Sequence, residues 1–359
     1  SSLISNELRD AFMAEVNKDY ERVREQNKNA QSQNKFISLE EARANKFPID
    51  WAKEKITKPK FLGTKVYANY SLSEIAEYID WTPFFHSWEM KGSYPKILSD
   101  PERGVEATKL FNEAKAMLAK IISEKWLTAK AVIGIYPATA IGKDDIEIKD
   151  EHYKKVKCVY HTLRQQTKKP AGQYNIALSD FIAPWGNGNQ DYIGSFALST
   201  GFGIDEHVKR FEAAHDDYNA IMLKALADRL AEAFAELMHK KVRREIWGYA
   251  SSESLSNDEL IKEEYAGIRP APGYPAQPDH TEKTTIWNLL NVEKNIGITL
   301  TDSLAMVPTA AVSGLYFANA KAQYFGLGKI NKEQVEDYAK RKRMTVADVE
   351  KWLGPVLSY

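Results

Sequence analysis

The sequence contains almost no cysteine. Its 359 residues include only Cys158, which excludes an internal disulfide framework and a thiolate cluster around a metal. The seven histidines show no paired spacing, and the zincin motif His-Glu-x-x-His does not occur. We therefore predict no metal site, and a reducing compartment such as the cytoplasm.

Long hydrophobic runs are also missing. The best candidate, residues 131–142, contains Pro137 and Thr139, and it falls short of the roughly 20 apolar residues that a membrane helix needs. There is no secretory signal, and the chain begins with Ser1 instead of methionine, which suggests a cut inside a longer polypeptide. We expect no membrane association.

An excess of either charge is absent too, because 49 Lys and Arg balance 49 Asp and Glu. Net charge therefore cannot recruit nucleic acid, and local groups must recognise any charged ligand. The common nucleotide and hydrolase motifs fail as well. The run 186–188 lacks the third glycine of a dinucleotide fingerprint, the run 326–329 lacks P-loop spacing, and Gly-x-Ser-x-Gly does not occur.

The hydrophobic content, 43% of the residues, is sufficient for a sizeable core. Charge and apolar residues alternate at helical spacing over residues 7–25, and a polar tract follows at 26–35. A capping box begins a short helix at Ser38 to Glu41. We place a boundary near residue 60, so that residues 1–60 form a helix and linker and residues 61–359 form the main domain.

Helix signals dominate the main domain. Capping patterns occur at Ser71 to Glu74, Ser256 to Glu259 and Asp279 to Glu282, and apolar stripes predict helices over 105–122, 218–234, 332–342 and 346–352. Strands are expected over 131–136, 145–148, 192–198, 312–317 and 324–330. The last two are close enough for an antiparallel hairpin across 318–323, which favours an α+β fold.

One unusual stretch, residues 267–280, carries four prolines that fix φ over a dozen residues. Its backbone should offer carbonyl acceptors with little internal pairing. Gly273 would permit close approach of a ligand, and Arg269 offers a planar fork suited to a carboxylate. The alternative is a proline-rich connector whose arginine pairs with a nearby acid.

Three carboxylates are candidates for the other side of such a site. Glu263 lies six residues before Arg269, and Glu232 belongs to a stripe of charged residues at intervals of four, which is more often a solvated helix face. Asp80 lies among aromatic residues that could make it a partner for an ammonium group, although it could equally cap the following helix.

Six runs together resemble the C-terminal activation domain of cobalamin-dependent methionine synthase. They are residues 78–85, 163–167, 178–184, 215–218, 225–236 and 267–283, and the most specific is Arg-x-x-x-Gly-Tyr at Arg269 to Tyr274. The resemblance extends from residue 60 to the end, and residues 1–60 are similar to the helix and linker that leave the cobalamin-binding domain. It implies a C-shaped single α+β domain with a bent antiparallel sheet flanked by helices and preceded by a helical linker.

The resemblance also implies binding of S-adenosylmethionine. Arg269 would hold the carboxylate of the methionine part, Asp80 would face its amino group, and Glu232 and Glu263 would lie around the ligand. The remaining ligand-binding positions would be Ala271, Gly273, Tyr274, His280, Tyr324 and Phe325.

No catalytic residue of the chain itself is expected, since the family transfers the methyl group to reduced cobalamin held by the neighbouring domain. The cobalamin signature Asp-x-His-x-x-Gly is absent, so this chain should not bind cobalamin alone. The implied electron donor is flavodoxin or a flavoprotein reductase. Lys240, Lys241, Arg243 and Arg244 could dock it, although a solvated helix end looks the same.

Two other functions remain open from the residues. The chain could be a free-standing methyltransferase that uses His215 and Asp216 as an acid–base pair. It could instead be a protein-interaction scaffold that binds no small ligand. Turnover without cobalamin would favour the first, and the absence of stabilisation by S-adenosylmethionine would favour the second.

Overall fold

The computed structural model describes residues 12–14, 16–22, 36–184, 186 and 190–359. The chain folds into two compact units. The small unit consists of the segment ending at Phe47 with Leu163–Ala177 and Gly326–Tyr359, and the sheet unit consists of Pro48–Thr162 and Leu178–Phe325. Each unit thus combines segments that are distant in sequence. The boundary near residue 60 stays a prediction.

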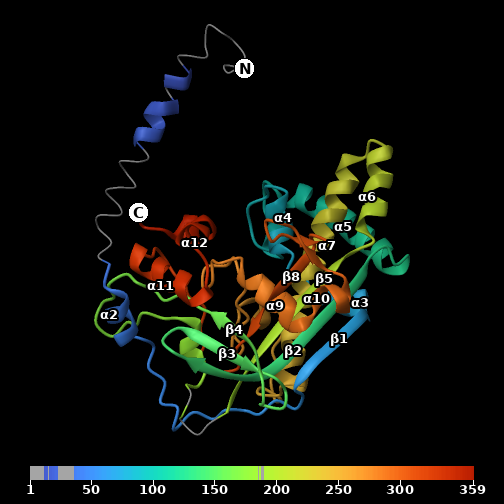
Figure 1. The fold of residues 1–359 in the computed structure, drawn as a ribbon. Helices are drawn as coiled ribbons and strands as arrows, with labels where there is room; N and C mark the ends of the chain where they lie inside the picture. Colours follow the sequence, from blue (N-terminus) through green and yellow to red (C-terminus); the bar gives the residue numbers. More distant parts are fainter. Residues whose placement is uncertain (1–11, 15, 23–35, 185, 187–189) are drawn as a thin grey trace. The chain divides into compact units, whose positions relative to one another are not determined.

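The sheet unit is built on a six-stranded antiparallel sheet (Figure 1). The strand order is β4-β3-β2-β5-β8, and β1 pairs with the first half of β2. The bounds are β1 Gly63–Tyr70, β2 Thr128–Ile141, β3 Asp145–Lys149, β4 Val156–His161, β5 Asp191–Phe202 and β8 Ala311–Tyr316. A separate two-stranded ladder joins β6 (Thr299–Leu300) to β7 (Met306–Val307). The α+β class with an antiparallel sheet is confirmed.

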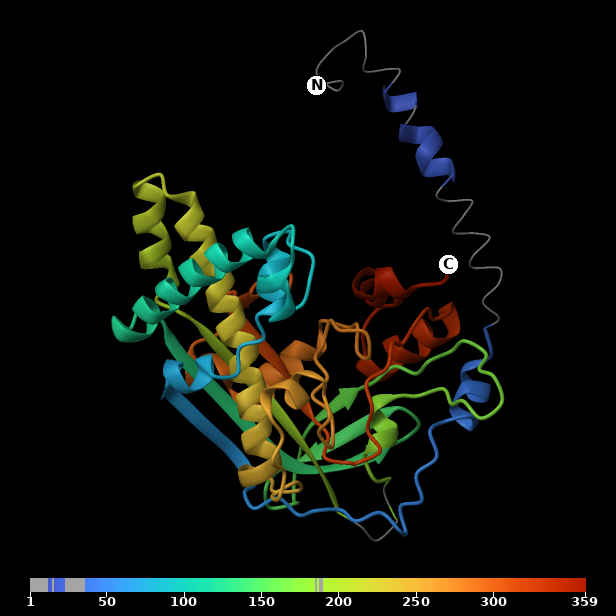
Figure 2. The same ribbon diagram turned by 180° about the vertical axis from the view of Figure 1, so that it is seen from behind.

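Helices cover both faces of this sheet. Their bounds are α3 Leu72–Ala76, α4 Thr82–Ser87, α5 Gly104–Ser123, α6 Ile204–Ala213, α7 Asp217–Lys241, α8 Asn257–Ile261, α9 Glu282–Leu290 and α10 Val292–Ile296. Helices α9 and α10 lie in front of the strands in Figure 1, and α7 crosses the opposite face in Figure 2. Alternation of strand side chains supplies both layers. Leu198 packs on the α7 side, whereas a Cβ at Gly134 would come within 2.5 Å of Leu290 of α9.

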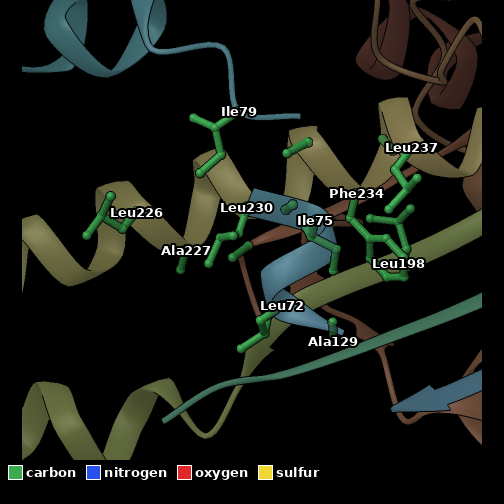
Figure 3. Close-up of a cluster of buried hydrophobic side chains, with 14 of the residues drawn as sticks. Leu72, Ile75, Ile79, Ala129, Leu198, Leu226, Ala227, Leu230, Phe234 and Leu237 are labelled. Atoms are coloured by element: carbon green, nitrogen blue, oxygen red, sulfur yellow. The ribbon is translucent and has the colours of Figure 1, made fainter. Parts of the chain in front are cut away.

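The layer between α7 and the sheet is the main hydrophobic core. Its side chains come from α7, α3 and the facing strands, as Figure 3 shows for Leu230, Phe234, Leu72, Ile75 and Leu198. Apolar residues at intervals of three or four along α7 face this core because of the helical period. The helix is therefore a fixed support for any residue on its remaining faces.

The predicted helix starts are mostly correct. Capping boxes form at Ser38 and Ser256, and the side chain of Ser71 accepts a hydrogen bond from the backbone of Glu74. The helix start predicted at Asp279 lies too early in the sequence, because α9 begins at Glu282. Asp279 instead accepts a hydrogen bond from the backbone of Thr281 at 2.8 Å. Residues 12–14 and 16–22 are helical, and the rest of the helix predicted at 7–25, with the linker at 26–35, lies outside the described residues.

One strand prediction fails, and the predicted hairpin fails with it. Residues 324–330 form no strand, so the hairpin across 318–323 is wrong, although β8 itself is confirmed. Leu327 and Ile330 are buried, and of the two only Ile330 pairs, in a single isolated bridge with Leu357. Strands β1 and β4 were missed because exposed residues interrupt the apolar alternation that would have indicated them.

The small unit contains α2 (Leu39–Ala44), α11 (Lys332–Lys342) and α12 (Val346–Leu353). Its core includes Leu163, Leu327, Ile330, Val335, Tyr338, Val349 and Leu353. Gln334 is fully buried here, and its amide bonds to the backbone N–H and carbonyl of Arg164 at 2.8 and 2.9 Å. The Gln334 amide therefore pairs the backbone groups of Arg164 as the backbone of a neighbouring strand would. None of the described helices has the length and apolar character to cross a membrane.

Candidate functional site

Two adjoining hollows of the sheet unit lie beside α7 and share three lining residues, Glu232, Glu263 and Arg269. One, the polar lobe, has a volume of about 260 Å³. It is lined also by Tyr78, Asp80, Pro83, Arg229, Ala233, Glu236, Leu260 and Ile261. The other, the apolar lobe, has a volume of about 450 Å³. It is lined also by Phe196, Pro270, Ala271, Tyr274, Pro275, Ala276, Val312, Tyr324 and Phe325.

The proline-rich stretch places Arg269 at the junction of the two lobes. Ile268 and Phe317 exchange backbone hydrogen bonds at 3.1 and 2.9 Å, and the carbonyl of Pro270 accepts one from Leu315 at 2.9 Å. The stretch is thus held beside the sheet next to β8, and its backbone is better paired than the prolines suggested. Because this loop is fixed at the edge of the sheet, the backbone that carries the Arg269 side chain has a fixed position.

The Arg269 side chain lies between an acid and open space. Its Nη1 donates to Glu236 Oε2 at 2.8 Å, and 18% of the side chain is exposed. Its backbone N–H donates to the hydroxyl of Tyr324 at 3.0 Å, which ties the aromatic wall of the apolar lobe to the arginine. The alternative role predicted for Arg269, pairing with a nearby acid, is therefore observed. Arg269 also lines both lobes, so it has both features.

The predicted carboxylates Asp80, Glu232 and Glu263 line the polar lobe together with Arg269. Burial raises the pKa of Glu263, and the charge of Arg269 partly offsets this rise. Asp80 lines the polar lobe while its Oδ1 accepts a hydrogen bond from the backbone of Thr82 at 2.9 Å, next to the start of α4. Asp80 thus bonds to the first residue of α4, although Trp81 is the N-cap, and it also lines the cavity. The polar lobe combines cationic and anionic groups within one small volume.

Four of the six remaining predicted residues line the apolar lobe: Ala271, Tyr274, Tyr324 and Phe325. Gly273 and His280 line neither lobe. Instead they pack on each other, since a Cβ at Gly273, where φ is 93°, would lie 2.2 Å from the His280 ring. The structure explains this glycine by a turn and by ring packing, and a ligand-binding role for the two residues stays a prediction.

Sequence reasoning missed Glu236, Arg229 and Phe196. Glu236 is only 9% exposed although its spacing suggested a solvated face, because the segments around α7 cover this part of the helix. A signal was available: residues 233–239 are apolar except for Glu236 and His239, which is typical of a helix buried on all sides. The polar residues within such a run are candidates for a buried site.

A charged cluster extends behind Arg269. The π-helical turn at Val242–Ile246 follows α7, and it carries Arg243, which is fully buried and binds Glu253 through two bonds of 2.7 and 2.9 Å. The predicted docking cluster is corrected at this position, because Arg243 lies in the interior and not on the surface. Burial, with the nearby Arg243 and Arg269, holds the pKa of His239 well below its usual range.

The acid–base pair of the free-standing methyltransferase has a structural role at Asp216. This residue caps α7, where it accepts hydrogen bonds from the side chain and backbone of Asn219 at 2.7 and 3.1 Å. These bonds lower the pKa of Asp216. Across the described ranges, no group of three or more His, Cys, Asp or Glu side chains could hold a metal ion.

Comparison with known proteins identifies a family and a similar solved structure. Residues 71–343 match the family described as vitamin B12 dependent methionine synthase, activation domain. The chain is also similar to a solved structure, the MetH reactivation domain bound to AdoHcy, with 52% sequence identity and a TM-score of 0.87. That similarity covers 90% of this chain and 99% of the other. The chain therefore belongs to the activation domains of vitamin B12-dependent methionine synthase.

Proposed function

We propose that the two lobes together bind S-adenosylmethionine, with the methionine part in the polar lobe and the adenosine part in the apolar lobe. As an activation domain of methionine synthase, the chain is a module of a methyltransferase. The observation that carries the proposal is that Arg269, Glu232 and Glu263 line both lobes. The similar reactivation domain binds AdoHcy, the demethylated form of this ligand.

The charges of the ligand match those of the cavity. S-adenosylmethionine carries a carboxylate, an ammonium group and a sulfonium, and each needs a partner when it leaves water. Arg269 would hold the carboxylate, Asp80 the ammonium group, and Glu232 and Glu263 would lie near the sulfonium at the junction. Asp80 lines the polar lobe and the other three line both lobes, which supports this arrangement.

The walls of the apolar lobe suit an adenine ring. Phe196, Tyr324 and Phe325 offer aromatic surface, and Pro270 and Ala271 come from the fixed loop beside β8. Stacking on aromatic rings does not depend on the charge of the ligand. The apolar lobe would therefore supply affinity, and the polar lobe would orient the ligand.

Bound S-adenosylmethionine would supply a methyl group to reduced cobalamin carried by the neighbouring domain of the enzyme. The residues of this chain would bind the donor, fix its direction and exclude water, so that proximity provides the rate gain. We expect no turnover by the isolated chain until the cobalamin domain and a one-electron donor, flavodoxin or a flavoprotein reductase, are present. A cytoplasmic location belongs to the same proposal. Turnover without cobalamin would instead support a free-standing methyltransferase.

Thermal unfolding with and without AdoHcy tests the proposal. A ligand at one hundred times its dissociation constant stabilises the folded state by about 2.7 kcal/mol, which is a shift of several degrees. Adenosine and methionine, added separately at the same concentration, are the controls, and each should shift the transition much less. The absence of any shift with millimolar AdoHcy would reject the proposal and favour an interaction scaffold.

A further inference from the structure

Glu236 lies between two guanidinium groups behind the cavity. Its Oε2 accepts from Arg269 Nη1 at 2.8 Å, and its Oε1 lies 3.8 Å from Arg243 Nη1. In the part of the chain that the structure describes, Glu236 Oε1 and Arg243 Nη1 are both buried without a hydrogen-bond partner. The carboxylate thus has one close contact, with Arg269, and one looser ionic contact behind it.

The rear guanidinium is held firmly. Arg243 makes two bonds to Glu253, and its guanidinium lies over the ring of Tyr265 at 4.2 Å from the ring centre. Its side chain has no solvent exposure, and it begins in the π turn, a distortion often found at functional sites. The fixed positive charge of Arg243 attracts Oε1 of Glu236, while Oε2 of Glu236 contacts Arg269.

We propose that Glu236 is a positioning residue, which holds the Arg269 guanidinium by Nη1 so that another edge faces the ligand carboxylate. The inference rests on the proposed function and adds a role for a residue that contacts Arg269 from behind. A long arginine side chain loses conformational freedom when it binds a ligand. The ion pair with Glu236 orders the side chain before the ligand arrives.

Removal of the charge has two opposing effects. The negative charge of Glu236 repels the ligand carboxylate, so that Glu236→Gln could tighten binding. An amide, however, has one acceptor oxygen and one donor NH₂ group, whereas both neighbours of Glu236 are donors. The amide introduced by Glu236→Gln can therefore satisfy only one guanidinium, and its NH₂ group opposes the other. Because short-range contact outweighs the screened repulsion, we expect loss of order at Arg269 and weaker binding.

Calorimetric titration with two ligands tests this role. AdoHcy carries the carboxylate, and decarboxylated AdoHcy keeps the amine but lacks it. Glu236→Gln should weaken AdoHcy about tenfold, which corresponds to loss of one charge-assisted contact. The decarboxylated ligand should change by less than about threefold, since Arg269 has no partner on it. Glu245→Gln is the matched control, because Glu245 is exposed and pairs with Lys241 at 3.5 Å away from both lobes.

Three results would overturn the inference: tighter binding of AdoHcy by Glu236→Gln, no change, or an equal loss for both ligands. If Glu236→Gln does not fold, Glu253→Gln replaces it, because loosening Arg243 should weaken AdoHcy in the same selective way. Wild-type protein that binds neither ligand would reject the proposed function itself. Wild-type binding with an unselective variant would reject only the role of Glu236.

Discussion

The replacement Arg269→Ala should greatly reduce affinity for AdoHcy. The guanidinium is the shared cation of both lobes, and only 18% of its side chain is exposed, so a ligand carboxylate bound there is poorly screened. Opposite unit charges 4 Å apart attract by about 4 kcal/mol at an effective dielectric constant of 20. Truncation of one partner of a buried, hydrogen-bonded charge pair costs about 2 to 5 kcal/mol, since the other charge is left unpaired.

This range corresponds to an increase of about 30- to 5,000-fold in the dissociation constant. Calorimetric titration with AdoHcy measures it directly. Arg269→Lys should give an intermediate loss, because it keeps the charge but not the planar fork. Arg244→Ala is the control, since Arg244 is exposed and lines neither lobe. Unchanged affinity in a folded Arg269→Ala protein would refute the assignment of Arg269 to the carboxylate.

Three further predictions concern stability. Burial holds the pKa of His239 well below its value in the unfolded chain, so the unfolded chain binds more protons on acidification and the free energy of unfolding should fall as pH drops below about 6.5. His239→Phe should make this fall less steep by up to about 1.4 kcal/mol per pH unit in urea unfolding from pH 6.5 to 5, and an unchanged slope would contradict the lowered pKa. Gly273→Ala should lower the free energy of unfolding by about 1 to 3 kcal/mol in the same assay, because the alanine would be strained at a positive φ and would displace the His280 ring. An unchanged stability would contradict the packing of Gly273 against that ring. Gln334→Leu should cost about 3 kcal/mol, since it leaves two buried backbone groups of Arg164 unpaired, and a stable variant would show that the amide is dispensable.

Much of the fold could be predicted from local signals. Ser38 and Ser256 form capping boxes because a hydroxyl and a carboxylate three residues apart can satisfy each other's backbone donors. The apolar stripe of α5 and that of α7 required helices because only a helix places such residues on one side. Leu327 and Ile330, by contrast, are buried in a segment that makes only an isolated bridge at Ile330, and a sequence pattern cannot distinguish such a segment from a strand.

Several residues that line the cavity were predictable where chemistry selects the residue type. Arg269, Asp80, Glu232 and Glu263 all line the cavity, in accord with the charges of the ligand that the family resemblance implied. Glu236 was not predicted, because a charged residue four positions from another usually faces solvent. Glu236 is buried because segments distant in sequence pack over this face of α7.

A crystal structure of this chain with AdoHcy would show where each part of the ligand binds. We expect the ligand carboxylate within hydrogen-bonding distance of the Arg269 guanidinium, its amino group beside Asp80, and its adenine ring in the apolar lobe. A ligand bound elsewhere, or one whose carboxylate points away from Arg269, would contradict the account.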